Sequence, residues 1–293
     1  MNTYKNVRKI SHETRHNMVG DGFRVYQYIP GSLNLTDDAS PFLMLDYNAP
    51  FRFPPSANRK GVGEHPHKGF ETVTIAFDGY IEHRDSSGGG GVIGPGDVQW
   101  MTAGNGILHD EFQTDEMSRN GGLQHMIQLW VNLPAKDKST PAAYQNLTDA
   151  MISRYKLDEL GSVVRVIAGS FAGVKGPAKT FTPVNMYDMI LNAGASTGFD
   201  IPLSHNSMLL VTKGKIRINE KTDASFRDFV LFDHNAENIH IEATEDARVF
   251  FISGEPIHEP VARYGPFVMN TREELIQAFE DFHSGKFGSI AAS

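Results

Sequence analysis

The sequence contains no cysteine among its 293 residues, which excludes disulfides, cysteine-ligated zinc and thiol catalysis. It also has no apolar run that approaches the ~20 residues a membrane span needs. Residues 1–23 carry basic side chains but lack the apolar segment of a secretory signal. From these absences we expect a cytoplasmic protein without a membrane span.

Positive charge is in short supply. There are 27 lysines and arginines against 35 aspartates and glutamates, a formal net charge of −8. Nucleic acids and anionic membranes bind basic faces, so we expect neither as a direct partner. The 40% hydrophobic content is ordinary for a globular protein, and the length suits two domains.

Two pairs of ligand-type side chains dominate residues 61–111. His65 and His67 are two residues apart, and so are His109 and Glu111. Residues i and i+2 of a β-strand point to the same face. If the two strands face each other inside a barrel, three imidazoles and one carboxylate converge, a set that suits a divalent first-row metal. The alternative is that these are ordinary histidines of a strand-rich region.

Glycine divides this part of the chain into short strands. Thr72–Phe77 reads as a strand, Asp78 and Gly79 as a hairpin turn, and Tyr80–Asp85 as the return strand. The Ser/Gly stretch Ser86–Gly91 has no phosphate-loop pattern and is expected to be a flexible turn. Further strands are expected at Phe23–Ile29, Val98–Thr102 and Gln124–Leu133.

The second half of the sequence repeats the first. Met208–Ile218 resembles Val73–His83, and Asp228–Glu242 aligns without gaps to Asp97–Glu111. A repeat of about 135 residues is too long for a solenoid and indicates two tandem β domains. We predict an N-terminal metal-binding domain at 1–134, a linker at 135–160 and a C-terminal domain with a degenerate metal site at 161–293.

The second copy has lost the first histidine pair. Asp200 and Pro202 stand at the positions of His65 and His67, whereas His240 and Glu242 keep the second pair. A proline side chain offers no donor atom to a metal, so we expect a degenerate site there. The alternative is a weak residual site formed by the three remaining polar residues.

A helix is predicted near the C-terminus. Thr271 and Glu274 form a capping-box pattern, and Gly285 marks the end of the helix. An apolar stripe, expected to pack on a domain face, consists of Leu275, Ile276, Phe279 and Phe282.

Four segments of the chain carry a family resemblance: HPHKGFETVTI, GPGDVQWMTAGNGILHDE, GLQHMIQLWVNLP and GEPIHEPVARYGPFVMNT. With these motifs the sequence resembles the pirin family of the cupin superfamily over nearly its whole length. The resemblance implies an all-β bicupin: two tandem antiparallel cupin β-barrels and a C-terminal helix, with metal only in the N-terminal barrel.

The same resemblance implies that His65, His67, His109 and Glu111 ligate one divalent metal ion. Iron, as Fe(II), is the expected ion, with Zn, Ni, Cu, Mn or Co as other possible occupants. A rival for the carboxylate is Glu71, because other cupin families use a glutamate shortly after the H-x-H pair. Strand parity would also place Glu71 on the face of that pair.

Pirin-like proteins are associated with quercetin 2,3-dioxygenase activity. The resemblance therefore implies a flavonol or similar aromatic substrate and dioxygen, with Glu111 as the general base for the substrate hydroxyl. The alternative is a redox-sensing regulator that binds a transcription factor or metabolic enzyme, and a third possibility is a metal-stabilised scaffold. The acidic charge fits a protein partner better than DNA.

His83 and His125 lie outside these two ligand pairs. His125 is a candidate to hydrogen-bond a ligand imidazole, although a core or rim position is the more common role for such a residue. His83 lies between Glu82 and Arg84 and is expected at the surface.

Overall fold

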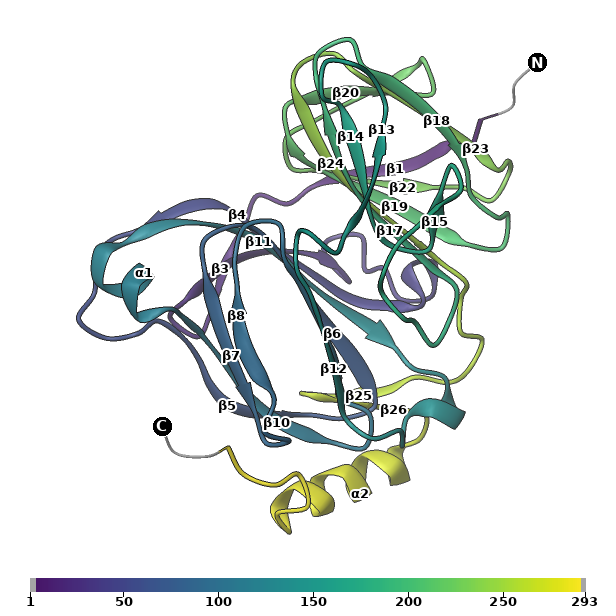
Figure 1. Ribbon diagram of the computed structural model, residues 1–293. Coiled ribbons are helices and arrows are strands. Elements are labelled where there is room, and N and C mark those ends of the chain that lie inside the picture. The colour runs from purple at the N-terminus through teal and green to yellow at the C-terminus, as the bar shows by residue number, and fades with distance from the viewer. Residues whose placement is uncertain (1–3, 291–293) are drawn as a thin grey trace. The chain divides into compact units, whose positions relative to one another are not determined.

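The computed structural model describes residues 4–290 and divides into two compact units (Figure 1). The first, here called the histidine unit, contains His65, His67, His109 and Glu111. Its segments are 15–27, 42–149 and 257–290. The other, here called the second unit, consists of segments 4–14, 28–41 and 150–256. Each chain end therefore joins the unit that is distant from it in sequence.

The histidine unit is built from two antiparallel sheets. The larger has seven strands, in the order β12 (Ala143–Leu147), β9 (Val98–Thr102), β6 (Phe70–Asp78), β11 (Gly122–Asn132), β4 (Phe42–Phe53), β3 (Phe23–Ile29) and β2 (Asn17–Val19). The smaller has four, in the order β5 (Gly61–His67), β10 (Ile107–Gln113), β7 (Ile81–Asp85) and β8 (Gly90–Ile93).

The two sheets of the histidine unit pack face to face. Ala76 and Met126 of the larger sheet share an apolar cluster with Ile81 and Ile93 of the smaller one. Each of these side chains is at most 1% exposed. Strand alternation directs one side of each sheet into this interior, so polar residues at the same parity also point inward.

The second unit repeats this plan. Its seven-stranded sheet has the order β1 (Val7–His12), β22 (Asp228–Phe232), β19 (Asn206–Lys213), β24 (Ala247–Gly254), β17 (Val184–Leu191), β14 (Val163–Ala168) and β13 (Ser153–Lys156). Its four-stranded sheet has the order β18 (Ser196–Asp200), β23 (Asn238–Ala243), β20 (Lys215–Ile218) and β21 (Thr222–Ser225). The predicted all-β fold of two cupin domains is confirmed. The matching hairpins turn at Gly79 and Gly214, which have φ values of +90° and +70°.

A few short elements complete the fold. They are η1 (Asp37–Ala39), η2 (Ala135–Asp137), α1 (Asp115–Asn120), and the pairs β15 (Ser170–Phe171) with β16 (Val174–Lys175) and β25 (Ala262–Tyr264) with β26 (Phe267–Met269). Within residues 4–290, neither helix has the length and apolar character that crossing a membrane requires.

The predicted C-terminal helix is confirmed as α2 (Arg272–His283), which lies beside β25 and β26 (Figure 1). Thr271 and Glu274 form the capping box. Leu275, Phe279 and Phe282 pack on an apolar cluster of the histidine unit, but Ile276 of the expected stripe is 51% exposed. The prediction that Ile276 packs is therefore wrong, and Ala278 is buried on that helix instead.

The chain ends and the middle segment differ from simple tandem domains. β1 pairs with β22, so the N-terminal strand completes the sheet of the second unit, where it lies in purple among green strands (Figure 1). Residues 135–160, predicted as a linker, contribute β12 to one sheet and β13 to the other. The expected flexible turn Ser86–Gly91 runs into strand β8 and is tied to Asp85, described below.

Candidate metal centre

The two ligand-bearing strands, β5 and β10, are hydrogen-bonded neighbours in the four-stranded sheet rather than strands that face each other. His109 lies directly opposite His65 in the antiparallel register, and His67 lies opposite Ile107. A β-bulge between the His109 and Glu111 pairings shifts β5, so that Glu111 is opposite Val62. The convergence therefore comes from cross-strand neighbours on one sheet face.

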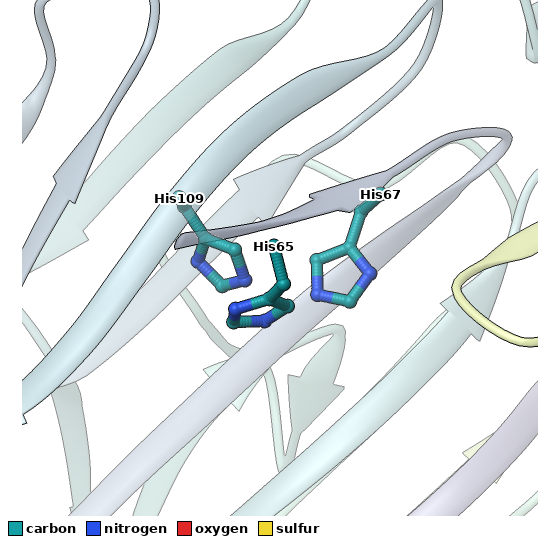
Figure 2. A group of neighbouring side chains, drawn as sticks. All are labelled: His65, His67 and His109. Atoms are coloured by element: carbon teal, nitrogen blue, oxygen red, sulfur yellow. The ribbon is translucent and has the colours of Figure 1, made fainter. Parts of the chain in front are cut away.

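Three imidazoles meet on this face, as Figure 2 shows. The ring centroids of His65 and His109 are 4.2 Å apart, those of His67 and His109 4.7 Å, and those of His65 and His67 4.8 Å. Each residue offers a ligand nitrogen within 4.8 Å of the others. His67 and His109 are buried, whereas His65 is half-buried.

The hydrogen bonds of the cluster leave donor atoms for a metal. The Nδ1–H group of His65 donates to the Gly63 carbonyl at 2.8 Å, so its Nε2 keeps a lone pair. Within residues 4–290, Nδ1 of His67 and Nε2 of His109 are buried without a hydrogen-bond partner. Buried polar atoms are normally paired, so these nitrogens fit ligation to an ion.

Burial favours the neutral form of His67 and His109, the two inner imidazoles. It lowers the pKa of His67 and of His109 well below the usual value, and the neighbouring histidines lower both further. Neutral imidazole is the form that ligates a metal. The lowered pKa of His67 and of His109 therefore favours metal ligation by these two residues.

Glu111 joins the cluster through His109. It is 4% exposed, and Gln128 Nε2 of the facing sheet donates to its two carboxylate oxygens at 3.1 and 3.3 Å. Glu111 and His109 form a second group with His83, in which the ligand atoms also lie within 4.8 Å of one another. Together, the two overlapping groups offer a donor set that can hold a metal ion.

Glu71 is in neither group. β5 ends at His67 in the smaller sheet, and β6 begins at Phe70 in the larger sheet. Gly69, with φ +87°, lies in the turn between them. Thr102 Oγ1 donates to Glu71 at 2.7 Å, and burial raises the pKa of this carboxyl to about 7. The parity argument failed because it carried strand alternation through a glycine turn into a different sheet.

The expectation that His83 lies at the surface is wrong, because its ring is 0% exposed. His83 and Asp85 share the inner face of β7 with Ile81, where they pair with Glu111 and His109 of β10. The alternation of these three residues with Glu82 and Arg84 was the signal in the sequence. Gln128, which donates to Glu111, and Tyr144, which stacks on His83, lie on the facing sheet. Neither residue had a comparable pattern in the sequence.

Two polar neighbours of His125 lie outside the group of ligand imidazoles. Its Nε2 lies 2.9 Å from Tyr47 Oη and its Nδ1 lies 3.8 Å from a carboxylate oxygen of Asp78. Both partners lie on the larger sheet, so His125 belongs to the packing of that sheet.

In the second unit, His240 and Glu242 point away from the core. The buried residues of β23 are Ile239, Ile241 and Ala243, which belong to an apolar cluster. Strand pairing shows the offset: Glu111 pairs with His83 of β7, whereas Ile241 pairs with Ile218, the residue of β20 that matches His83 when Gly79 and Gly214 are aligned. The gap-free alignment therefore fails before β23, and a shift of one residue turns the histidine outward.

Comparison with known proteins places these features in a family. Residues 22–131 match the pirin family, and residues 186–288 match the pirin C-terminal cupin domain. A crystal structure described as quercetin 2,3-dioxygenase from Acinetobacter baumannii superposes with a TM-score of 0.92 at 44% identity, covering 99% of this chain and 100% of that one.

Two further relatives match this chain over most of the length of both proteins. A Pseudomonas aeruginosa protein, provisionally named as a quercetin 2,3-dioxygenase, is 44% identical over 97% of this chain and 98% of its own. A pirin-like protein of Caulobacter vibrioides is 41% identical over 84% of this chain and 87% of its own.

Proposed function

Since the chain belongs to the pirin family of cupin proteins, we propose that it is an iron-dependent oxygenase that opens the ring of a flavonol or a similar aromatic substrate, as quercetin 2,3-dioxygenases do. The observation that carries the proposal is the cluster of three imidazoles, of which His67 and His109 have a buried ring nitrogen without a hydrogen-bond partner within residues 4–290. The names of the relatives support the substrate class.

His65, His67, His109 and Glu111 would hold the ion. Imidazole and carboxylate together suit Fe(II), and also Zn, Ni, Cu, Mn or Co. A bound divalent ion supplies Lewis acidity toward a substrate oxygen and, if it is redox-active, a means of activating dioxygen. These four ligands would leave room on the ion for substrate or dioxygen.

Glu111 is the proposed general base. It would accept the proton of the substrate 3-hydroxyl group, and the bonds from Gln128 hold its carboxylate in one orientation. The resulting electron-rich substrate reacts with dioxygen, the central heterocycle opens, and one ring carbon leaves as carbon monoxide.

Aromatic side chains shield this chemistry from water. Trp130 packs edge-on against His67 with 5.3 Å between ring centroids, and Phe70 contacts both rings. Exclusion of water protects reactive intermediates and strengthens the electrostatic interactions inside the site.

The test is turnover by protein of known metal content. Protein purified without added metal is analysed for its elements, loaded anaerobically with Fe(II), and mixed with quercetin and air. We expect oxygen consumption with release of carbon monoxide. Because a general base contributes roughly 10²–10⁴-fold, Glu111→Gln should lose at least about 100-fold in turnover while retaining some metal.

Glu242→Gln is the matched control. It makes the same change on the outward face of β23, and turnover should stay at the wild-type level. Unchanged turnover in Glu111→Gln would remove this residue from the role of base. If the iron-loaded wild type neither consumes oxygen nor releases carbon monoxide with quercetin, the oxygenase proposal for this substrate is wrong.

A further inference from the structure

The outer nitrogen of His109 faces another histidine. His109 Nδ1 lies 3.2 Å from His83 Nδ1, and the two ring centroids are 5.0 Å apart. Both residues are 0% exposed. Two ring nitrogens at this distance form a hydrogen bond only if one carries a proton and the other a lone pair. The proton has two possible positions, and only one leaves His109 Nε2 able to ligate a metal.

Asp85 determines which position is occupied. Its Oδ1 accepts from Ser87 N at 2.8 Å, Ser87 Oγ at 2.6 Å and Gly89 N at 3.0 Å. Its Oδ2 has no hydrogen-bond partner within residues 4–290 and lies 3.7 Å from His83 Nε2. A carboxylate only accepts, so His83 presents Nε2–H toward Asp85. The lone pair of His83 then lies on Nδ1.

The rest of the chain of contacts follows. His83 Nδ1 accepts a hydrogen bond from His109 Nδ1–H, which leaves a lone pair on His109 Nε2. The reverse arrangement would leave His109 with a buried N–H that has no acceptor among the described residues. Tyr144 stacks on His83 with 5.3 Å between centroids and 21° between planes, so this ring is held in place.

We propose that His83, backed by Asp85 and the Ser87–Gly89 turn, is a positioning residue that fixes the tautomer and ring orientation of His109 for metal binding. The inference rests on the metal site of the proposed function. Outer hydrogen-bond partners of ligating histidines typically matter by about 10–100-fold in metal affinity. The competing role for His83 is that of a direct ligand, since it also groups with His109 and Glu111.

The experiment measures Co(II) affinity by competition with a chelator. His83→Phe keeps a ring that can stack on Tyr144 but removes the acceptor, and we expect affinity to fall about 10–100-fold. His83→Asn places an oxygen near the former Nδ1, so it should restore much of that loss. His125→Phe is the matched control, because it replaces a buried histidine of the same unit outside the cluster, and its affinity should equal that of the wild type.

Proton NMR of the Co(II)-loaded protein provides a readout that packing alone would not change. In the wild type, the His109 Nδ1–H signal should be shifted by the ion and exchange slowly with water. In His83→Phe this exchangeable signal should be lost while the carbon-bound ring signals of all ligand imidazoles remain. Loss of one complete set of ring signals would show that His83 is itself a ligand and would overturn the positioning role.

The outcomes separate the two proposals. Wild-type affinity in His83→Phe, with the N–H signal retained, overturns the inference alone. Tight Co(II) binding, combined with no quercetin turnover by the Fe(II)-loaded protein, contradicts the proposed oxygenase and leaves the inference intact. If His83→Phe does not fold, Asp85→Asn tests the same series of contacts from Asp85 through His83 to His109. We expect this variant to bind Co(II) more weakly and its N–H signal to exchange faster with water. Wild-type values of both quantities would refute the proposal.

Discussion

The C-terminal helix is expected to stabilise the histidine unit through one buried ion pair. Lys68 Nζ lies 3.0 Å from Asp281 Oδ2, and the two side chains are only 7% and 12% exposed. Lys68 immediately follows His67, and its ammonium group also donates to the backbone and side-chain oxygens of Asn105. Asp281 further accepts from Lys286, whose side chain is 63% exposed. The variant Asp281→Asn keeps the shape of the side chain and removes its charge.

The expected loss in free energy of unfolding depends on the partners that the buried ammonium group of Lys68 keeps. Losing one partner of a buried ion pair costs about 3–5 kcal/mol, and losing a hydrogen bond to a charged group costs about 1.5–3 kcal/mol. Lys68 keeps its two bonds to Asn105, so we expect about 2 kcal/mol for Asp281→Asn. The control Lys286→Gln removes only the solvent-exposed partner and should cost less than about 1 kcal/mol.

Tryptophan fluorescence isolates the relevant unit. The chain has two tryptophans, Trp100 and Trp130, and both lie in the histidine unit. In urea, a loss of 2 kcal/mol moves the fluorescence midpoint by roughly 1 M for slopes of about 1–3 kcal/mol/M. If Asp281→Asn unfolds within about 0.5 kcal/mol of Lys286→Gln, the buried pair does not stabilise the unit and the reasoning is wrong.

The pH dependence gives an independent check. Hydrogen bonds from Lys286 and then Lys68 lower the pKa of Asp281 to about 2, while burial opposes them. A carboxyl with a depressed folded pKa contributes stability that is fully present above its unfolded pKa of about 3.9 and is lost as pH falls toward 2. The difference between wild type and Asp281→Asn should therefore shrink between pH 4 and pH 2, and a constant difference would contradict the ion-pair explanation.

The remaining predictions concern the second unit and the metal. Asp188 is buried between Arg165 and Arg248, so Asp188→Asn should cost about 3 kcal/mol in a far-UV circular dichroism transition that tryptophan fluorescence does not report. The control Asp223→Asn breaks only exposed ion pairs and should leave that transition at the wild-type position. Removing an ion present at about 100 times its Kd should destabilise the tryptophan-containing unit by about 2.7 kcal/mol, and chelation should have no such effect on His109→Ala.

The sequence predicted the elements that depend on local patterns. The strands Phe23–Ile29 and Val98–Thr102 have the expected bounds, and the capping box at Thr271 begins α2 as predicted. The positions of His65, His67 and His109 followed from i, i+2 spacing, because alternation within one strand is a local property. Pairing between strands is not local, so we expected the His65/His67 pair and the His109/Glu111 pair on facing strands, whereas the two strands are neighbours in one sheet.

Errors about which face of a strand a residue occupies had larger effects than errors about where the strands and helices lie. Parity carried through Gly69 would place Glu71 beside the histidines, and the gap-free alignment would place His240 where His109 stands. In both cases the segment between two strands changes the sheet face to which the side chain points. Because side chains alternate with a period of two residues, a shift of one residue moves every side chain to the other face. β10 and β23 therefore carry nearly the same motif, but the inner face of β10 has polar residues and that of β23 has apolar ones.

This offset explains why one unit keeps polar groups inside and the other does not. At the inner positions of β10 the histidine unit has His109 and Glu111, each of which must be hydrogen-bonded or ligated to offset the cost of burial. At the corresponding inner positions of β23 the second unit has Ile239 and Ile241, which need no partner. A core of isoleucine stabilises a barrel by burial alone, whereas the nitrogens of His67 and His109 that have no partner within residues 4–290 reduce the stability of the metal-free barrel until a cation binds. The histidine unit should consequently be the one whose stability depends on metal.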